Sequence, residues 1–307
     1  MKYFIGMDGG GTKTDAVITN INGEKLFECS GGASNFLVQG TLTVSQTLLK
    51  LIQKCVSEID ASINDIACVL LGTTGAGRRT DAEKLETDFS NFLKEQNIKL
   101  NLFYVESDAR VALEGAFAGK PGSILIAGTG SIMFGKDSEG NIHRVGGFGR
   151  FLGDEGSGYM LGKKGLVAVS KQFDGRNEKT LITKLVTEKF GIETSEVLIT
   201  EIYKNNFDIA SVAPVIIEAA AKSDSAALQI VEDETNELLL HIKSMFKKIN
   251  EQELNVAFIG GLISSENFYS NLFREKIKAQ LPQVNVIEPI YPPAMGAVLM
   301  AKQKVGI

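Results

Sequence analysis

An aspartate and three glycines stand behind the first apolar run of the chain, and these residue types suit nucleotide chemistry. The run is Tyr3–Gly6, and Asp8 directly precedes Gly9–Gly11. Glycines carry no Cβ atom, so backbone N–H groups in such a turn can approach phosphate oxygens closely. Because a phosphate would repel the carboxylate of Asp8, the pair implies a cation between them, as in a metal–nucleotide. A plain hairpin turn is the alternative that this segment alone leaves open.

A second loop of small residues, Gly128–Ser131, follows the apolar strand Ile124–Ala127. The hydroxyls of Thr129 and Ser131 and the exposed N–H groups suit a second phosphate clamp, and a tight hairpin is again the alternative. Two such loops in corresponding places favour phosphate binding. The P-loop pattern and the dinucleotide pattern G-x-G-x-x-G are both absent, so the architecture is a different one.

Two carboxylates occupy places where chemistry is common. Asp108 closes the expected strand Phe103–Glu106 and opens a helix, so it could accept a proton from a substrate hydroxyl or simply cap the helix. Asp154 lies in the polar elbow Gly153–Gly158. It could bind sugar hydroxyls, order the water of a metal ion, or cap the helix that follows.

Three further glycine-rich turns follow strands. Gly260 and Gly261 come after a buried strand and would let adenine or ribose approach the backbone. Gly72–Gly77 is either a ligand loop or a flexible connector. Gly146–Arg150 ends in a cation that could meet an anion or lie on the surface.

The composition limits the classes of protein. The chain has 307 residues, of which 44% are hydrophobic and 22% charged, which allows two globular domains. A formal charge of −5 disfavours a nucleic-acid or membrane-surface binder. We expect no signal peptide, no membrane span and a cytoplasmic location. Three separated cysteines indicate buried thiols, and two histidines disfavour a histidine metal site or a Ser-His-Asp triad.

The hydrophobic pattern predicts one order of elements twice. In the first half we expect strands near 3–8, 14–20 and 25–30, a helix near 41–59, a strand at 66–71, a helix around Phe89, a strand at 100–106 and a helix from Asp108. In the second half we expect strands near 123–128, 131–135 and 142–146, a helix from Gly156, a helical insertion, strands near 254–259 and 284–288, and a last helix near 294–303. Two such halves facing each other would place the two small-residue loops across a cleft.

An ordered set of motifs now resembles a known family. The set is Asp8-Gly9-Gly10-Gly11-Thr12-Lys13-Thr14, Ser107-Asp108-Ala109, Ala127-Gly128-Thr129-Gly130-Ser131, Gly153-Asp154-Glu155-Gly156-Ser157 and Gly260-Gly261. Together they resemble the N-acetylglucosamine kinases of the BadF/BadG/BcrA/BcrD ATPase family, within the sugar kinase/Hsp70/actin superfamily. The resemblance covers nearly the whole chain.

The resemblance implies an α/β fold of two ribonuclease H-like (actin-like ATPase) domains with a nucleotide and sugar cleft between them. The first domain would span 1–118 with the returning helix 293–307, and the second would span 119–292 with a helical insertion. The implied ligands are ATP, Mg²⁺ and an amino sugar, with no nucleic acid, no membrane and a homodimer left open. The small residues of Pro292–Ala297 would permit close packing of the returning helix.

The resemblance also implies roles for individual residues. Asp108 would be the catalytic base, and Asp8 would order Mg²⁺ through water. The implied ATP and phosphate contacts are Gly10, Gly11, Thr12, Lys13, Gly128, Thr129, Gly130, Gly260 and Gly261. The implied substrate contacts are Asn35, Asp108, Gly128 and Asp154. For Asn35, a loop asparagine bonded to its own backbone is the alternative.

The expected activity is phosphorylation of N-acetylglucosamine, N-acetylmuramic acid or both at the 6-hydroxyl, in amino-sugar or cell-wall sugar salvage. Two alternatives on the same fold stay open. One is an ATPase that activates a radical dehydratase through a [4Fe–4S] cluster, which requires suitably placed thiolates. The other is a sugar sensor without catalysis, although the acidic balance disfavours DNA binding.

Overall fold

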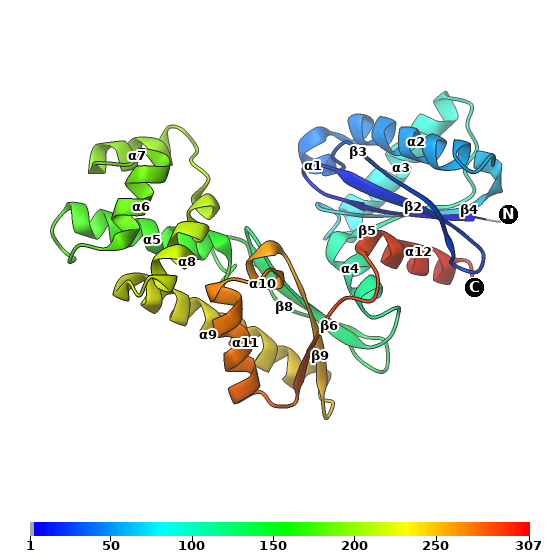
Figure 1. Cartoon of the computed structure of the whole chain (residues 1–307). Helices are drawn as coiled ribbons and strands as arrows, with labels where there is room; N and C mark the ends of the chain where they lie inside the picture. The colour runs from blue at the N-terminus through cyan, green and yellow to red at the C-terminus, as the bar shows by residue number, and fades with distance from the viewer. Residues whose placement is uncertain (1–2) are drawn as a thin grey trace. The chain divides into compact units, whose positions relative to one another are not determined.

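The computed structural model describes residues 3–307, and it divides into two compact units (Figure 1). Unit 1 comprises the residues up to Gly122 together with Glu288–Ile307, and unit 2 comprises Ser123–Ile287. The divisions expected from the sequence fell at 118 and 293. Unit 1 is therefore built from both ends of the chain, with unit 2 inserted between them.

Unit 1 is a five-stranded sheet covered by helices on both faces. Its elements are β1 (Tyr3–Gly9), β2 (Thr14–Asn20), β3 (Lys25–Gly31), α1 (Phe36–Gln39), α2 (Thr41–Ser57), η1 (Ile63–Asp65), β4 (Ile66–Thr73), α3 (Arg79–Glu95), β5 (Phe103–Ser107), α4 (Asp108–Ala116) and α12 (Pro293–Lys304). The strand order is β3-β2-β1-β4-β5. β1 runs parallel to β4, and β4 runs parallel to β5, whereas β2 is antiparallel to both of its neighbours.

Alternating side chains of the central strands build two separate cores. Ile5 and Met7 of β1 point to the face covered by α2 and α3, whereas Phe4 points to the face covered by α4 and α12 (Figure 1). β4 behaves in the same way, with Val69 on the first face and Leu70 on the second. Both faces are covered, so β4 is buried along its whole length, as a central parallel strand should be.

The returning helix α12 packs very closely on unit 1, as its small residues predicted. A Cβ atom on Gly296 would lie 1.9 Å from the carbonyl oxygen of Val111 in α4. A Cβ atom on Gly6 of β1 would lie 2.1 Å from the carbonyl oxygen of Ala294. These contacts leave no room for any side chain, so both glycines are required by packing.

Replacing Gly296 with alanine is therefore expected to destabilise unit 1 by about 1–3 kcal/mol, the usual cost of overpacking. The added methyl group would overlap backbone atoms, which move less readily than side chains. Urea unfolding measures the effect, and Gly77→Ala is the matched control because a Cβ atom there would meet nothing within 4 Å. Equal midpoints for the two variants would contradict the close packing.

Unit 2 repeats the same sheet and adds helices. Its elements are β6 (Gly122–Ala127), β7 (Ser131–Lys136), β8 (Ile142–Gly146), α5 (Gly158–Phe173), α6 (Leu181–Phe190), α7 (Ser195–Tyr203), η2 (Ile209–Val212), α8 (Ala213–Ala221), α9 (Ser225–Ile249), β9 (Leu254–Ile259), α10 (Gly261–Ser264), α11 (Phe268–Gln280) and β10 (Val284–Ile287). The order β10-β9-β6-β7-β8 matches that of unit 1, with β6 in the place of β1. The expected duplication is therefore confirmed, and the insertion consists of α6 to α9.

A few sequence expectations were wrong in detail. The strand expected from residue 100 begins at Phe103, and α1 was not expected. Cys55 and Cys68 are buried free thiols, as expected, but Cys29 is only half-buried because β3 lies at the edge of its sheet. In the part of the chain that the structure describes, no helix has the length and apolar character to cross a bilayer.

Candidate active site

Three parallel strands of unit 1 end side by side and bring the expected residues together. The register aligns Gly9 of β1 with Thr73 of β4, and Thr73 with Ser107 of β5. Asp8 and Asp108 therefore lie at the same edge of the sheet, with Thr74 following β4 between them. In open α/β sheets this carboxyl edge is the usual place for ligands.

Asp108 is held by hydrogen bonds but does not cap its helix. Its Oδ2 atom accepts from the Thr74 hydroxyl at 2.7 Å, and its Oδ1 atom accepts from the N–H of Ala109 at 2.7 Å. The cap of α4 is Ser107, whose side chain accepts from the N–H of Arg110. The alternative interpretation of Asp108 as the helix cap is therefore wrong, because the hydroxyl of Ser107 caps α4. Each oxygen of the half-buried carboxylate keeps a free lone pair.

Asp8 sits in surroundings that disfavour its charge. Burial, then the negative charges of Asp108 and Asp15, raise its pKa from the ordinary 3.8 to about 6, while Lys13 lowers it. The ammonium group of Lys13 lies 2.7 Å from the Asp15 carboxylate in an exposed pair. Exposed pairs of this kind contribute little stability, so Lys13 can exchange this partner for a phosphate at small cost.

The loop after β1 is a hairpin connection, and two of its glycines face open space. β1 and β2 pair in antiparallel register up to Gly9 and Thr14. A Cβ atom on Gly9 would lie 1.7 Å from the Ser34 hydroxyl, whereas Cβ atoms on Gly10 or Gly11 would meet nothing within 4 Å. The hairpin interpretation and the phosphate interpretation are thus compatible. Thr12 is exposed in the same loop.

Asn35 offers a buried acceptor with no donor. Its N–H binds the carbonyl of Gly10 at 3.2 Å, which fixes Asn35 beside the glycine loop. Its Oδ1 atom is buried, and no hydrogen-bond partner for it exists among residues 3–307. The side chain does not cap α1, and this bonding pattern disfavours a loop asparagine bonded to its own backbone. A buried carbonyl oxygen without a donor costs about 1–3 kcal/mol, which a ligand N–H or O–H would recover.

In unit 2, the loop Gly128–Ser131 is fastened to the turn that carries Asp154. The N–H groups of Gly158 and Tyr159 donate to the carbonyls of Gly128 and Thr129 at 2.8 and 3.1 Å. A Cβ atom on Gly130 would lie 2.9 Å from Oδ2 of Asp154, so this carboxylate lies directly against the loop. The cap of α5 is Ser157, so the interpretation of Asp154 as a helix cap is wrong.

A cavity of about 580 Å³ opens beside the loop, within unit 2. Its lining includes the loop residues Gly128, Thr129 and Gly261 and the polar residues Asp208, Ser211 and Asn267. Its apolar walls are Ala210, Ala213, Pro214, Ile217, Ala221, Leu262 and Phe268. Glu218 and Gly158 complete the lining. A mostly apolar cavity with a few polar groups is typical of a site for a small molecule or cofactor.

Gly260 and Gly261 were both expected to let a ligand approach the backbone, but they have different roles in the structure. Gly260 has φ +95°, and a Cβ atom there would lie 2.4 Å from the carbonyl oxygen of Ala127, so it packs against the end of β6. Gly261 alone lines the cavity. The residues from η2 and α8 were missed because they belong to a helical insertion with no glycine signal. Only their helical spacing, as between Pro214 and Ile217, could have identified them.

A second cavity, of about 410 Å³, adjoins the same loop. It is lined by Thr129, Arg150, Asp154, Tyr159, Asn206, Phe207, Asp208 and Ile209. The guanidinium of Arg150 lies over the rings of Phe151 and Tyr159, with its carbon 5.2 and 5.8 Å from the ring centres. Arg150 therefore shares a cavity with Asp154.

Comparison with known proteins identifies the family. Residues 5–301 match the model of the BadF/BadG/BcrA/BcrD ATPase family. The chain is 32% identical to the N-acetylmuramic acid/N-acetylglucosamine kinase of Clostridium acetobutylicum, over 99% of both chains. It is 31% identical to the N-acetyl-D-glucosamine kinase of Dictyostelium discoideum, over 98% of both.

Solved structures agree on the fold. A candidate N-acetylglucosamine kinase from Chromobacterium violaceum matches with a TM-score of 0.76 and 25% identity over 99% of both chains. A glucokinase of the ROK family from Streptomyces griseus matches with a TM-score of 0.58 at 15% identity, over 98% of this chain and 99% of the other. The expected α/β fold of two ribonuclease H-like units is confirmed. The chain belongs to the BadF/BadG/BcrA/BcrD ATPase family.

Proposed function

We propose that this protein is an ATP-dependent amino-sugar kinase, acting on N-acetylglucosamine, N-acetylmuramic acid or both at the 6-hydroxyl. The observation that carries the proposal is the meeting of Asp8, Asn35 and Asp108 at the carboxyl edge of one sheet. The names of the two relatives that are more than 30% identical support the choice of substrate. A cytoplasmic location, with the cellular supply of ATP, is part of the same proposal.

In this mechanism Asp108 is the general base. It accepts the proton of the sugar hydroxyl while that oxygen forms a bond to the γ-phosphorus, and the bond from the γ-phosphorus to the β–γ bridging oxygen breaks, which releases ADP. The bonds from Thr74 and Ala109 fix the carboxylate, so one oxygen lone pair can face the acceptor. Asn35 accepts a hydrogen bond from the sugar through its unpaired Oδ1 atom.

Asp8 fits the role of a ligand to Mg²⁺, directly or through water. Burial first, and then the negative charges of Asp108 and Asp15, raise the pKa of Asp8, and a bound cation would offset both effects. Mg²⁺ usually keeps several waters and uses one or two carboxylates together with nucleotide phosphates. When bound, Mg²⁺ neutralises charge on the phosphates.

ATP is proposed to place its adenosine in the 580 Å³ cavity of unit 2. The phosphates then meet the loop Gly128, Thr129 and Gly130 in unit 2. The N–H groups of Thr129 and Gly130 are the donors, because that of Gly128 already donates to the carbonyl of Gly130 at 3.0 Å and closes the turn. In unit 1, Gly10, Gly11, Thr12 and Lys13 supply further phosphate contacts. Gly261 gives the nucleotide access to the backbone, and Gly260 allows the close approach of that turn to β6.

The cysteines give no support to the radical-dehydratase alternative. Burial raises the pKa of the Cys68 thiol to about 12 and raises that of Cys55 further. Cys29 lies 3.8 Å from Cys55, sulfur to sulfur, inside unit 1. A [4Fe–4S] cluster needs thiolates, and the burial of Cys55 and Cys68 disfavours that form.

Arg150 is proposed to distinguish the two sugars. N-acetylmuramic acid carries a lactyl carboxylate that N-acetylglucosamine lacks, and Arg150 is the cation that shares a cavity with the sugar contact Asp154. Asp154 and Asp208 line the same cavity and oppose an anion, so we expect Arg150 to offset them. Stacking on the rings of Phe151 and Tyr159 orients the guanidinium, which can then form hydrogen bonds with the lactyl carboxylate.

A panel of sugars tests the function. We expect Mg-ATP-dependent phosphorylation of N-acetylglucosamine or N-acetylmuramic acid, and little with glucose or N-acetylmannosamine, measured by ADP release and product mass. Arg150→Gln should raise KM for N-acetylmuramic acid about tenfold and leave N-acetylglucosamine nearly unchanged, since loss of one charged hydrogen bond has about that effect. ADP release indifferent to every sugar would overturn the kinase proposal. Sugar binding without turnover would indicate a sensor.

A further inference from the structure

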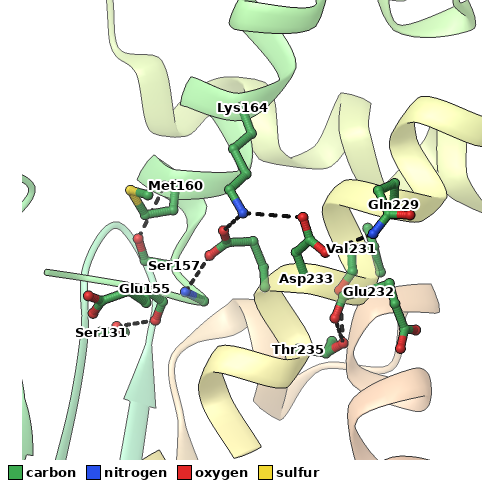
Figure 2. Close-up of polar contacts among 12 residues, drawn as sticks. Ser131, Glu155, Ser157, Met160, Lys164, Gln229, Val231, Glu232, Asp233 and Thr235 are labelled. Atoms are coloured by element: carbon green, nitrogen blue, oxygen red, sulfur yellow. Dashed lines mark hydrogen bonds and ion pairs between the residues drawn. The ribbon is translucent and has the colours of Figure 1, made fainter. Parts of the chain in front are cut away.

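Three side chains form hydrogen bonds with the backbone of the turn that carries Asp154, all at Glu155 and Gly156. The carbonyl of Glu155 accepts the hydroxyl of Ser131, at the end of the phosphate loop, at 2.6 Å (Figure 2). The N–H of Gly156 donates to Oε2 of Glu234 at 2.6 Å, and its carbonyl accepts the hydroxyl of Tyr269 at 2.9 Å. The three side chains come from three different elements, β7, α9 and α11.

Glu234 is a buried acid on α9 that belongs to neither cavity. Its side chain is 1% exposed, and its second oxygen lies 2.7 Å from the ammonium of Lys164 in α5. Figure 2 shows Lys164 reaching across from α5 toward α9, with Asp233 at the outer side of the pair. A carboxylate buried this deeply requires both partners, because an unpaired buried charge is strongly destabilising.

The turn also packs directly on α9. Gly156 has φ +79°, and a Cβ atom there would lie 2.3 Å from the Leu238 side chain. Asp154 has φ +63°, in the left-handed region that an aspartate adopts only when its surroundings hold it there. Burial raises the pKa of Tyr269 well above its usual value, so its hydroxyl stays protonated and remains a donor to Gly156.

We infer that Glu234 and Lys164 are positioning residues, which hold the turn of residues 153–159 against the phosphate loop and so orient Asp154. The inference rests on the proposed function, because it assigns the turn a part in binding sugar and nucleotide. The coupling is short, since the N–H groups of Gly158 and Tyr159 bind the phosphate loop only two and three residues after Gly156. A shift of the Gly156 peptide therefore moves both ligand contacts together.

The chemistry of an amide substitution gives a sharp test. In Glu234→Gln, one carboxamide oxygen cannot accept from both Gly156 and Lys164, and the new NH₂ group faces one of these two donors. We expect KM for both sugar and ATP to rise about tenfold, the value of one charged hydrogen bond, while kcat changes less. Adding Lys164→Met removes the conflicting donor, so the double variant should recover most of the lost affinity.

A second ion pair on the same helix, in which the lysine is buried and the glutamate is exposed, supplies the control. The ammonium of Lys276 in α11 lies 2.6 Å from the carboxylate of Glu232 and donates to Thr235 and Asn236 at 2.9 and 2.7 Å, and all three of these partners belong to α9. Lys276→Met should lower stability at least as much as Glu234→Gln and leave both KM values unchanged. A purely structural role for Glu234 predicts the same outcome for both variants, with less active enzyme and normal KM.

Hydrogen exchange tests the positioning without any kinase assay. In Glu234→Gln, amide exchange of residues 154–159 should accelerate by about tenfold or more, and it should stay slow in Lys276→Met and in the Glu234→Gln, Lys164→Met double variant. If the protein is not a kinase, the amide exchange rates should still change as described, but no KM effect should be seen. Unchanged exchange in the turn of Glu234→Gln, or no recovery in the double variant, would overturn the positioning role.

Discussion

Asp108→Asn is expected to lower kcat by about 10²–10⁴, the usual contribution of a general base, with the fold intact. An amide cannot take the proton of the sugar hydroxyl. Its oxygen can still accept from the N–H of Ala109, and its NH₂ group can donate to the Thr74 hydroxyl, which is able to accept. The fold should survive because the cap of α4 is Ser107 and not Asp108. Steady-state kinetics at saturating sugar and Mg-ATP measure the loss, and KM for the sugar should change much less than kcat.

Ser107→Ala is the control for this experiment. It removes the helix cap one residue away, so it should cost about 1 kcal/mol of stability and leave kcat nearly normal. The pair of variants thus separates chemistry from helix stability at neighbouring positions. Near-normal turnover in Asp108→Asn would remove Asp108 from the mechanism.

Asp8→Asn is expected to make the protein more stable and much less active. The pKa of Asp8 is raised in the folded protein from 3.8 to about 6, so the folded state retains a proton that the unfolded chain has lost. The free energy of unfolding therefore falls as pH rises through this window, and above about pH 6 the full penalty applies. Without Mg²⁺ at about pH 7.5, the variant should gain at most about 3 kcal/mol.

Its activity should fall by about a hundredfold or more, because a ligand to Mg²⁺ is lost. In the unsubstituted protein, Mg²⁺ and a proton compete for Asp8, so higher Mg²⁺ should move the acid limb of kcat/KM to lower pH. Urea unfolding at about pH 5 and 7.5 and rate profiles at two Mg²⁺ concentrations measure both effects. Asp15→Asn, at the exposed neighbour, should give smaller changes in each, and equal effects in the two variants would exclude a special role for Asp8.

Local patterns predicted the strands and glycine loops well, because they depend on neighbours in sequence. Asp8, Asp108 and Gly128 were found because each marks the end of a strand. Whether Asp108 caps its helix stayed open, since Ser107 and Asp108 are both suitable cap residues and only the backbone geometry decides between them.

Contacts between distant segments could not be predicted in the same way. Gly156 and Glu234 are separated by 78 positions, and no local pattern distinguishes Glu234 from other acids on a helix. The apolar walls of the 580 Å³ cavity combine Pro214 and Ile217 with Phe268, which reads in the sequence only as helix core. The role of these residues can be recognised only when the packing of α8 against α11 is known.

Unit 1 is formed by two separate segments of the chain, and this affects how it folds during synthesis. Ala297, Val298 and Ala301 of α12 complete the core beneath Phe4 and Leu70, yet they are translated after all of unit 2. On the ribosome, the part of that face of β1 and β4 that α4 does not cover must therefore stay exposed while residues 123–287 are made and can fold. We expect nascent chains that stop before Pro293 to bind chaperones through this apolar face, and release to follow the emergence of the last helix.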